Sequence, residues 1–503
     1  MVKLAAIILI YALRADLKLG FRVRNSRLPL FYLFIIAIGV LDALIIPGAK
    51  GLNYSIVVIT GIGFWLLSIL AIHQVKLSVD NLDTGVIQKT ISAFFIINAS
   101  ISLGTLLLII VKTGAINPYL YQGEYQRYFI GTGDYIRGVS FDTSTTNAVL
   151  NAFGAIYFLS QKKAPMTLLC MIVLLLTGSN MTNLVLCAAL LFVFIFQSDK
   201  DQKSLILINL FFLVIFLAKV SPQNNRYVAS TFRDFFSEPS GQININAVKN
   251  TPDSVLNAQE KKQKVARLYL DSVALANRPK LVSIGSATVQ PDLQLSLPFN
   301  DLNAPEFQHK SFTTATEENM RQFIDVHSHF LPMSSDATYH PMLPGKIISW
   351  RQTFNYLSKH PARAVAGAGI GNFSSKLAFK ATGLKIAGSW PSNYKYINEA
   401  FLENHLDTYL YYFSKPDEYH STINNPASVY DQLIAEYGIA GLVGYLIFYA
   451  GFFLKNFRSL SFGMPLIIVI SGVFFFDYWF EQLSIVIFFE LLMFLNLKER
   501  KLR

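Results

Sequence analysis

The chain has 503 residues, of which 52% are hydrophobic and only 15% are charged. This composition excludes a disordered tail and argues against an ordinary soluble globule, because a soluble chain of this length forms several domains and needs more charge on its surface. The formal net charge is +11, so the question for function is where along the chain the cations lie.

Apolar runs predict ten membrane-spanning helices. A helix rises about 1.5 Å per residue, so about 20 apolar residues cross the hydrocarbon core. The predicted spans are residues 28–48, 53–75, 90–112, 143–160, 164–180, 181–197, 203–220, 428–454, 460–478 and 482–497. Residues 2–14 are apolar but short and have no small-residue cleavage site, which predicts a short or half-inserted helix, with eleven spans in total as the alternative, rather than a removed signal peptide.

Positive charge is concentrated in alternate connectors between these spans. Seventeen of the 23 Lys and Arg residues outside 221–427 lie there. Positively charged short loops face the cytoplasm, so these connectors and the C-terminus are predicted to be cytoplasmic. The connectors are residues 14–27, 76–89, 162–163, 200–203, 455–458 and 498–503. The polar segment 221–427 is therefore predicted to lie outside the cytoplasm.

The chain is thus predicted to be all-α, with N-terminal spans in 1–220, one large and mainly helical loop domain in 221–427, and C-terminal spans in 428–503. The loop contains 20 Lys or Arg and 17 Asp or Glu residues. Because these charges nearly balance, the excess cations indicate topology, and a nucleic-acid partner is not expected. Cys170 and Cys187 lie in apolar runs and cannot provide a disulfide framework or a zinc cluster.

Four segments in order along the chain carry a family resemblance. They are RGVSFDTSTTNAVLNAFGA (137–155), LLLTGSNMTNL (174–184), WRQTFNYLSKHPARAVAGAGIGNF (350–373) and YDQLIAEYGIAGLVG (430–444). They resemble the Gly-rich helix start, the short hairpin between spans, the outer-loop helix with its glycine pattern, and the re-entry helix of the O-antigen polymerase/O-antigen ligase superfamily. These bacterial enzymes are similar to the GT-C class of membrane glycosyltransferases.

The resemblance implies a multi-pass enzyme of the bacterial inner membrane, with 10–12 spans and a periplasmic loop. Its expected activity is polymerisation of undecaprenyl-diphosphate-linked oligosaccharide repeats into O-antigen, capsular or exopolysaccharide, without a metal or cofactor. The expected partners are the lipid-linked glycan donor, a glycan acceptor, membrane lipid and a chain-length regulator protein. The alternative within the superfamily is a ligase that transfers the glycan to lipid A core or protein.

The sequence departs from the family pattern at two positions, and the second departure favours the polymerase over the ligase. Asn180 stands where the hairpin often has Arg, and Ala427 stands where the ligase-like His-Asn pair would precede the re-entry helix. A lipid-linked sugar transporter or flippase is an alternative of another class, but transporters tend to have two similar halves, and this sequence shows no obvious internal repeat. A receptor-like or scaffold protein is a third class.

Three arginines are candidates to bind the diphosphate or the glycan, because a guanidinium meets phosphate oxygens bidentately. Arg137 lies just before a predicted span on the outer side, against the positive-inside bias. The alternative is that it reaches to headgroups or pairs with Asp134 or Asp142. Arg351 lies beside Trp350 in the outer-loop motif. Arg127 lies in an aromatic run that an interfacial tyrosine belt would also explain.

Three residues are candidates for the catalytic base. His420 titrates near neutrality and precedes the re-entry helix, although a lone loop histidine is more often solvated or structural. Glu436 lies in the re-entry motif, where it could instead anchor the helix. His405 is the third candidate.

Other groups have simpler interpretations. Asp325, His327 and His329 would share one face of a strand and could bind zinc, but a surface role is favoured and no metal is expected. The carboxylates of Asp42 and Glu490 lie in apolar spans and are expected to form structural pairs. The glycine run 367–371 could cradle a phosphate, but a tight turn after a helix is favoured.

Overall fold

The fold is described from a computed structural model. It describes residues 7–9, 28–45, 51–120, 131–140, 142–220, 320, 322–324, 326, 343–413, 421–455, 457 and 460–501. These residues are mostly helical and include no β-strand, which confirms the all-α prediction for this part of the chain. Arg127, His420, Asp325, His327 and His329 lie outside the described residues.

Four helices are long and apolar enough to cross a membrane, judged by length and composition. They are α4 (Leu52–Asn81), α5 (Thr84–Thr113), α9 (Lys200–Ile215) with its π-helical continuation to Val220, and the run Val429–Leu454. This run comprises α19 (Val429–Gly444), the π-helical η11 (Tyr445–Ala450) and α20 (Gly451–Leu454). Shorter apolar helices are α3 (Phe31–Ile45), α7 (Ala164–Leu176), α8 (Asn180–Phe196) and α21 (Gly463–Val473). The count of ten crossings therefore stays a prediction.

The predicted connector 76–89 is wrong in one respect, because most of it is helical. Helix α4 continues to Asn81 and α5 begins at Thr84. The Asp83 side chain caps α5 by accepting a hydrogen bond from the Gly85 amide at 2.7 Å. The charged residues here interrupt the hydrophobic run, but they do not end the helix. A Lys and an Asp four residues apart also support helical structure.

Side chains join the predicted cytoplasmic connectors at one end of the helices, called the connector end. Lys498 of α22 (Leu483–Lys501) donates to the backbone oxygen of Val79 at 2.6 Å, and so caps the C-terminus of α4. Gln88 donates to Glu499 at 2.9 Å, and Lys162 pairs with Asp199. Residues at or beside four of the positive connectors, 76–89, 162–163, 200–203 and 498–503, thus lie together.

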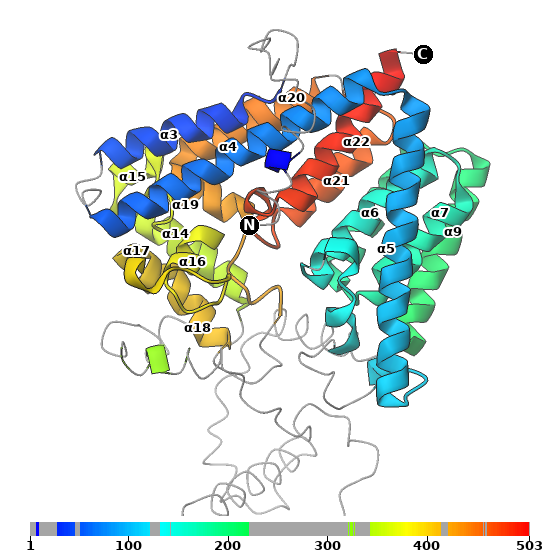
Figure 1. The fold of residues 1–503 in the computed structure, drawn as a ribbon, viewed down its shortest axis with the longest axis horizontal. Coiled ribbons are helices and arrows are strands. Elements are labelled where there is room, and N and C mark those ends of the chain that lie inside the picture. The colour runs from blue at the N-terminus through cyan, green and yellow to red at the C-terminus, as the bar shows by residue number, and fades with distance from the viewer. Residues whose placement is uncertain are drawn as a thin grey trace, which may run out of the picture. The chain divides into compact units, whose positions relative to one another are not determined.

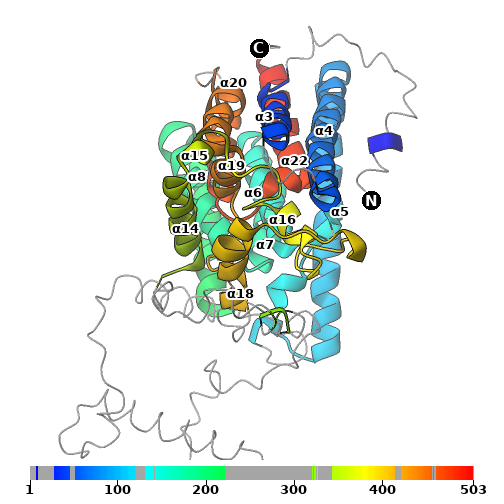
Figure 2. The ribbon, with the colours of Figure 1, turned by 90° about the vertical axis from the view of Figure 1, so that its left-hand side faces the viewer.

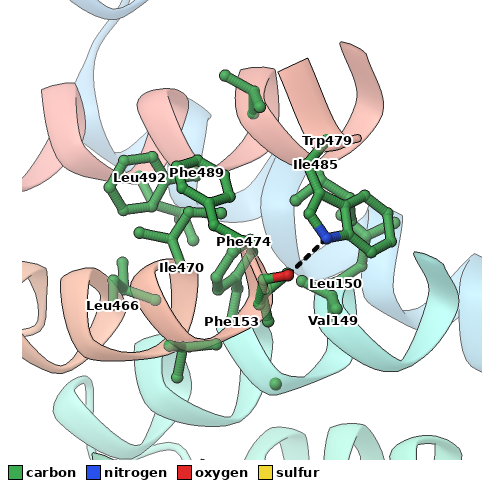
Figure 3. Packing of buried hydrophobic residues seen from close by; sticks show 14 of the residues in the cluster. Val149, Leu150, Phe153, Leu466, Ile470, Phe474, Trp479, Ile485, Phe489 and Leu492 are labelled. Atoms are coloured by element: carbon green, nitrogen blue, oxygen red, sulfur yellow. Dashed lines mark hydrogen bonds between the residues drawn. The ribbon is translucent and has the colours of Figure 1, made fainter. Parts of the chain in front are cut away.

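Aromatic and aliphatic side chains fill the space between α6 (Ser144–Ser160), α21 and α22 (Figure 3). Val149, Phe153, Ile470 and Phe489 are all buried, and the Trp479 indole donates to the Val473 backbone oxygen at 2.7 Å. Burial of such side chains is the main favourable term inside the bundle.

Short helices cover the opposite end of α3, α4 and α19 (Figures 1 and 2). They are α14 (Gly345–Lys359), α15 (Pro361–Ala366), α16 (Lys376–Ala381), α17 (Glu399–Phe401), the π-helical turn Leu402–Leu406 and α18 (Asp407–Phe413). Helices α14 and α15 both pack on α19. These short helices form one unit with the apolar helices, since all described residues belong to the unit Met1–Tyr227 and His309–Arg503.

Candidate functional site

The re-entry helix α19 is broken at Gly438, where the backbone has φ 68° and ψ −169°. At the break, backbone carbonyl oxygens of α19 lose their hydrogen bonds within the helix. The glycine turn supplies their donors: the Ala368 amide donates to the Ala435 oxygen at 2.8 Å, and the Gly369 amide to the Glu436 oxygen at 3.0 Å. Irregular backbone is tolerated between apolar helices only when other groups satisfy it in this way.

This contact explains the glycine run. Gly367 has φ 93°, and a Cβ atom there would overlap the backbone of Glu436. A Cβ at Gly438 would likewise overlap the Val365 backbone oxygen. The glycines permit two backbones to approach closely, so the turn has a structural role that needs no phosphate.

A buried polar cluster joins the short helices to α19. His405 is fully buried, with Nδ1 2.9 Å from the Ser349 hydroxyl and Nε2 2.7 Å from the Tyr478 hydroxyl. Asp431, in the first turn of α19, accepts hydrogen bonds from Ser374 at 3.1 Å and Ser349 at 3.3 Å. Five separate segments therefore meet in this cluster around one histidine and one carboxylate.

The protons in this cluster can be assigned from its partners. Burial, followed by the charge of Lys346, lowers the pKa of His405 to about 3, so the ring is neutral at pH 7. Since Ser349 uses its proton on Asp431, it accepts from Nδ1–H, and Nε2 accepts from the Tyr478 hydroxyl. His405 thus links the segments, and it has no exposed surface in this structure with which to meet a glycan hydroxyl.

Lys346 is a buried cation that clamps α14 to the spanning helices. Its ammonium donates to the backbone oxygens of Asn425 at 2.9 Å, Phe476 at 3.2 Å and Ala427. Burial lowers the pKa of Lys346 to about 7, while the carboxylates of Asp477 and Asp431 oppose this shift. Three acceptors match the three protons of an ammonium group.

Glu436 lies one turn beyond this cluster, beside the break in α19, and is fully buried. Its Oε1 accepts from the Phe373 amide at 3.4 Å, so the outer-loop and re-entry motifs meet here. Its Oε2 accepts no hydrogen bond from any residue that the structure describes. Glu436 therefore lies at the meeting point of two motifs and is only partly satisfied.

Arg351 is exposed on α14, on the side of the helix that faces away from the buried cluster. The neighbouring aromatic side chains are partly exposed too: Phe354 is 53% exposed and Phe475 47%. Trp350 packs against both rings, with centroids 5.9 Å from Phe354 and 6.3 Å from Phe475. The guanidinium is thus presented beside a small aromatic surface.

Arg137 is exposed on a short turn that asparagines fix from beneath. The Asn98 side-chain oxygen accepts from the Val139 amide at 2.9 Å, and the Asn147 amide group donates to the Ile136 backbone oxygen at 2.9 Å. Gly138 has φ 63°, and a Cβ there would lie 2.6 Å from the Asn147 oxygen. The backbone on both sides of Arg137 is therefore held by hydrogen bonds, while its side chain is exposed.

The alternative pairing of Arg137 with Asp134 has a structural basis. The Arg137 Nε donates to the Asp134 backbone oxygen at 3.3 Å. Burial raises the pKa of the Asp134 carboxyl to about 6, while Ser144 and Arg137 favour its ionised form. The turn before the first family-like segment also lies against the second one, because a Cβ at Gly133 would overlap the Thr177 backbone oxygen of the 174–184 hairpin.

The two carboxylates in apolar helices have different surroundings. Tyr32 donates to Glu490 at 2.6 Å, which agrees with the expected structural pair. Asp42 is buried with one oxygen that accepts no hydrogen bond from the described residues, and it interacts electrostatically with Arg363 on α15. No group of three or more residues able to hold a metal occurs in the described part of the chain.

Comparison of the chain with protein-family models, curated proteins and solved structures gives no match. The site therefore rests on its own geometry. The described contacts join the segments in two pairs: 137–155 with 174–184, and 350–373 with 430–444.

The sequence context of Lys346 and Asp407 does not mark them as buried polar groups. Asp407 is fully buried, and neither of its carboxyl oxygens accepts a hydrogen bond from the residues described here. A lysine followed by an apolar helical pattern indicates a helix start, and an aspartate among tyrosines indicates a surface loop. Neither pattern reveals burial, which arises only when distant segments pack together.

Proposed function

We propose that this protein is a membrane glycosyltransferase that polymerises oligosaccharide repeats carried on a lipid diphosphate. The observation that carries the proposal is the contact between the outer-loop segment and the re-entry segment at the break in the apolar helix α19. Arg351 is exposed on α14, the helix that Lys346 attaches beside this contact. Discontinuous helices are a recurrent way to build polar sites at the level of a bilayer. The resemblance of the four segments to the polymerase/ligase superfamily supplies the reaction class.

In this proposal, Arg351 holds the diphosphate of the donor, and Arg137 is a second candidate contact to the diphosphate or to the glycan. An acceptor hydroxyl attacks the anomeric carbon of the donor while the lipid diphosphate leaves, so negative charge grows on the leaving group. A guanidinium fixed at that place stabilises the transition state more than the ground state. The Asn98–Asn147 support and the Lys346 clamp would keep the two cations in position.

Polymerase is proposed over ligase because of Ala427. This residue is buried, and its backbone oxygen accepts from Lys346, so the segment before α19 serves as an attachment point for α14. The position where the ligase-like histidine is expected therefore carries a methyl side chain inside the protein.

The reaction is tested by deleting the gene in its host and separating the surface glycan on a gel. Single-repeat glycan in the deletion strain supports a polymerase. Lipid-linked polymer that never reaches its acceptor indicates a ligase instead, and repeats retained in the inner leaflet indicate a flippase.

The arginines are tested in the same strain. We expect R351A and R137A each to lower polymer formation by about 10² to 10³, the usual effect of losing one transition-state contact. The matched control is K359A, which removes an exposed cation from the last turn of the same helix α14. Wild-type polymer in R351A and R137A at normal protein level would reject these two assignments.

The proposed outward face of the short helices is tested separately by cysteine labelling. A membrane-impermeant maleimide applied to spheroplasts should modify S358C, on exposed α14, and should not modify K163C, at the connector end. The reverse pattern would place the site in the cytoplasm and exclude the proposed reaction.

A further inference from the structure

Residues 343–398, which include the short helices α14, α15 and α16, carry charge of one sign only. They contain eight Lys or Arg residues and no Asp or Glu, although Asp and Glu supply 32 of the 503 residues of the chain. The near balance of charge over 221–427 therefore conceals a separation, because all 17 acidic residues of that segment lie before or after this stretch. A surface with charge of one sign attracts partners of the opposite sign.

Three lysines of this stretch gather around one loop, and we call them the lysine patch: Lys380, Lys385 and Lys395. A Cβ atom at Gly383 would lie 2.7 Å from Lys395 Cε, and one at Gly388 would lie 3.9 Å from Lys380 Cε. Lys385 and Lys395 are exposed, Lys380 is partly exposed, and none of the three forms an ion pair with a described residue. Because neighbouring like charges repel each other, an anion bound between them relieves the repulsion.

The backbone of this loop is held in place by its own contacts. The Tyr396 amide donates to the Ala381 oxygen at 3.0 Å and so joins the two ends of the loop. The Asn53 side chain, at the start of α4, donates to the Lys395 oxygen at 2.9 Å. Leu384 packs on a buried cluster of apolar side chains below the loop. The lysine patch is therefore fixed before a ligand arrives, which lowers the entropy cost of binding.

The exposed surface around the lysine patch is polar and aromatic. The Trp390 indole is partly exposed and donates to the Tyr394 backbone oxygen at 2.7 Å, and Tyr394 itself is 38% exposed. Among the described residues of 367–438, no Leu, Ile, Val or Phe side chain is exposed, whereas such side chains are exposed on α14 and α15. A surface that enters lipid needs exposed apolar side chains. The lysine patch is therefore suited to a partner in water.

Asn372 connects the lysine patch to the proposed site. This residue belongs to the outer-loop segment 350–373, and its side-chain oxygen accepts from the Tyr396 hydroxyl at 2.7 Å, one residue after Lys395. The amide of the next residue, Phe373, donates to Glu436 beside the break in α19. A glycan bound at the lysine patch therefore lies next to the contact between the outer-loop and re-entry segments.

We infer that the lysine patch binds a negatively charged sugar of the glycan, so that the repeat unit polymerised by this protein is acidic. This inference rests on the proposed polymerase function and deepens it, because it names the class of substrate. The carboxylate of a uronic acid, or a phosphate substituent, accepts hydrogen bonds from the ammonium groups. The aromatic rings of Trp390 and Tyr394 offer flat apolar surfaces on which the C–H faces of the sugar rings pack.

The first test is the composition of the glycan. The glycan that is shortened by deletion of the gene is purified from the wild-type host and applied to an anion-exchange column at pH 7. We expect the column to retain it and sugar analysis to find an acidic group in its repeat. A neutral glycan that the deletion shortens overturns the inference and leaves the polymerase proposal standing. A deletion that leaves every glycan unchanged rejects the polymerase proposal itself.

The second test changes the lysine patch in the host strain. Replacement of its three lysines by glutamine (K380Q/K385Q/K395Q) removes charge from the surface and leaves the buried clusters intact. Polymer formation should fall at least about tenfold at unchanged protein level. The matched control removes three exposed lysines at the connector end and should leave polymer unchanged: K89Q/K163Q/K200Q. Equal amounts of polymer in the two triple variants overturn the inference.

The third test measures binding to the purified full-length protein in phosphatidylcholine nanodiscs. The probe is oligogalacturonate, a chain of uronic acids, and a dextran oligosaccharide of equal length is the neutral control. Wild type should bind oligogalacturonate at least about tenfold more tightly than K380Q/K385Q/K395Q does, more weakly as salt is added, and in preference to dextran. Equal binding by the two proteins overturns the inference. It is also overturned if the triple variant loses only the thermal stabilisation by phosphatidylglycerol, because the patch then faces lipid.

Discussion

Asp407 provides the sharpest prediction about stability. It is fully buried on α18, and neither carboxyl oxygen accepts a hydrogen bond from the described residues. Burial raises its pKa to about 8. The folded protein therefore keeps this group protonated at pH 7, whereas the unfolded chain, with a pKa of about 3.9, ionises it.

The sign and size of the effect follow from proton linkage. Because the folded state binds the extra proton, stability is greatest below about pH 3.9 and falls as the pH rises towards about 8. Each pH unit in this window costs about 1.4 kcal/mol, so wild type loses roughly 4 kcal/mol by pH 7. D407N is neutral in both states and lacks this loss.

The assay is thermal unfolding of the detergent-solubilised protein, followed by intrinsic fluorescence between pH 5 and 8. D407N should melt higher than wild type at pH 7, and the difference should shrink as the pH is lowered. The control is E403Q, an exposed carboxylate on the preceding turn, which should match wild type throughout. A D407N curve that runs parallel to wild type at every pH would refute the reasoning.

Two further substitutions test the supports beneath the arginines. K346M leaves three backbone carbonyls without their hydrogen-bond donor, which should destabilise the folded protein by about 1–3 kcal/mol for each carbonyl. The melting temperature of the detergent-solubilised protein should therefore fall, and an unchanged melting temperature would mean that the clamp contributes nothing. G138A places a Cβ against Asn98 and Asn147, so it should cut polymer formation as R137A does while α5 and α6 stay folded. Wild-type polymer in G138A would show that the Arg137 turn need not be fixed.

The sequence predicted the helices better than their lengths or their contacts. Apolar runs located α6 and α8 to within a residue at each end, because both lie between short polar turns. The ends of α4 and α5 were missed because charged residues continue a helix beyond an apolar run. The break at Gly438 was also missed, since a glycine within a hydrophobic helix resembles any small residue used for packing.

The candidate site could be predicted only in part. The motif pattern selected Arg137, Arg351 and Glu436, and the structure leaves both arginines exposed. His405 and Glu481 show what a linear pattern cannot give. The first is neutral because four segments enclose it, and the second accepts a hydrogen bond from Gln432, a contact that no spacing in the chain reveals.

The cap that Lys498 places on α4 has a consequence for biosynthesis. The two residues that meet, Val79 and Lys498, are separated by 419 positions. At about 5–20 residues per second, roughly 20 to 80 s pass between their synthesis. During that interval α4 sits in the bilayer without its neighbour, with polar side chains such as Gln74 not yet enclosed. We therefore expect the insertion machinery or another chaperone to shelter this early hairpin until its distant partner arrives.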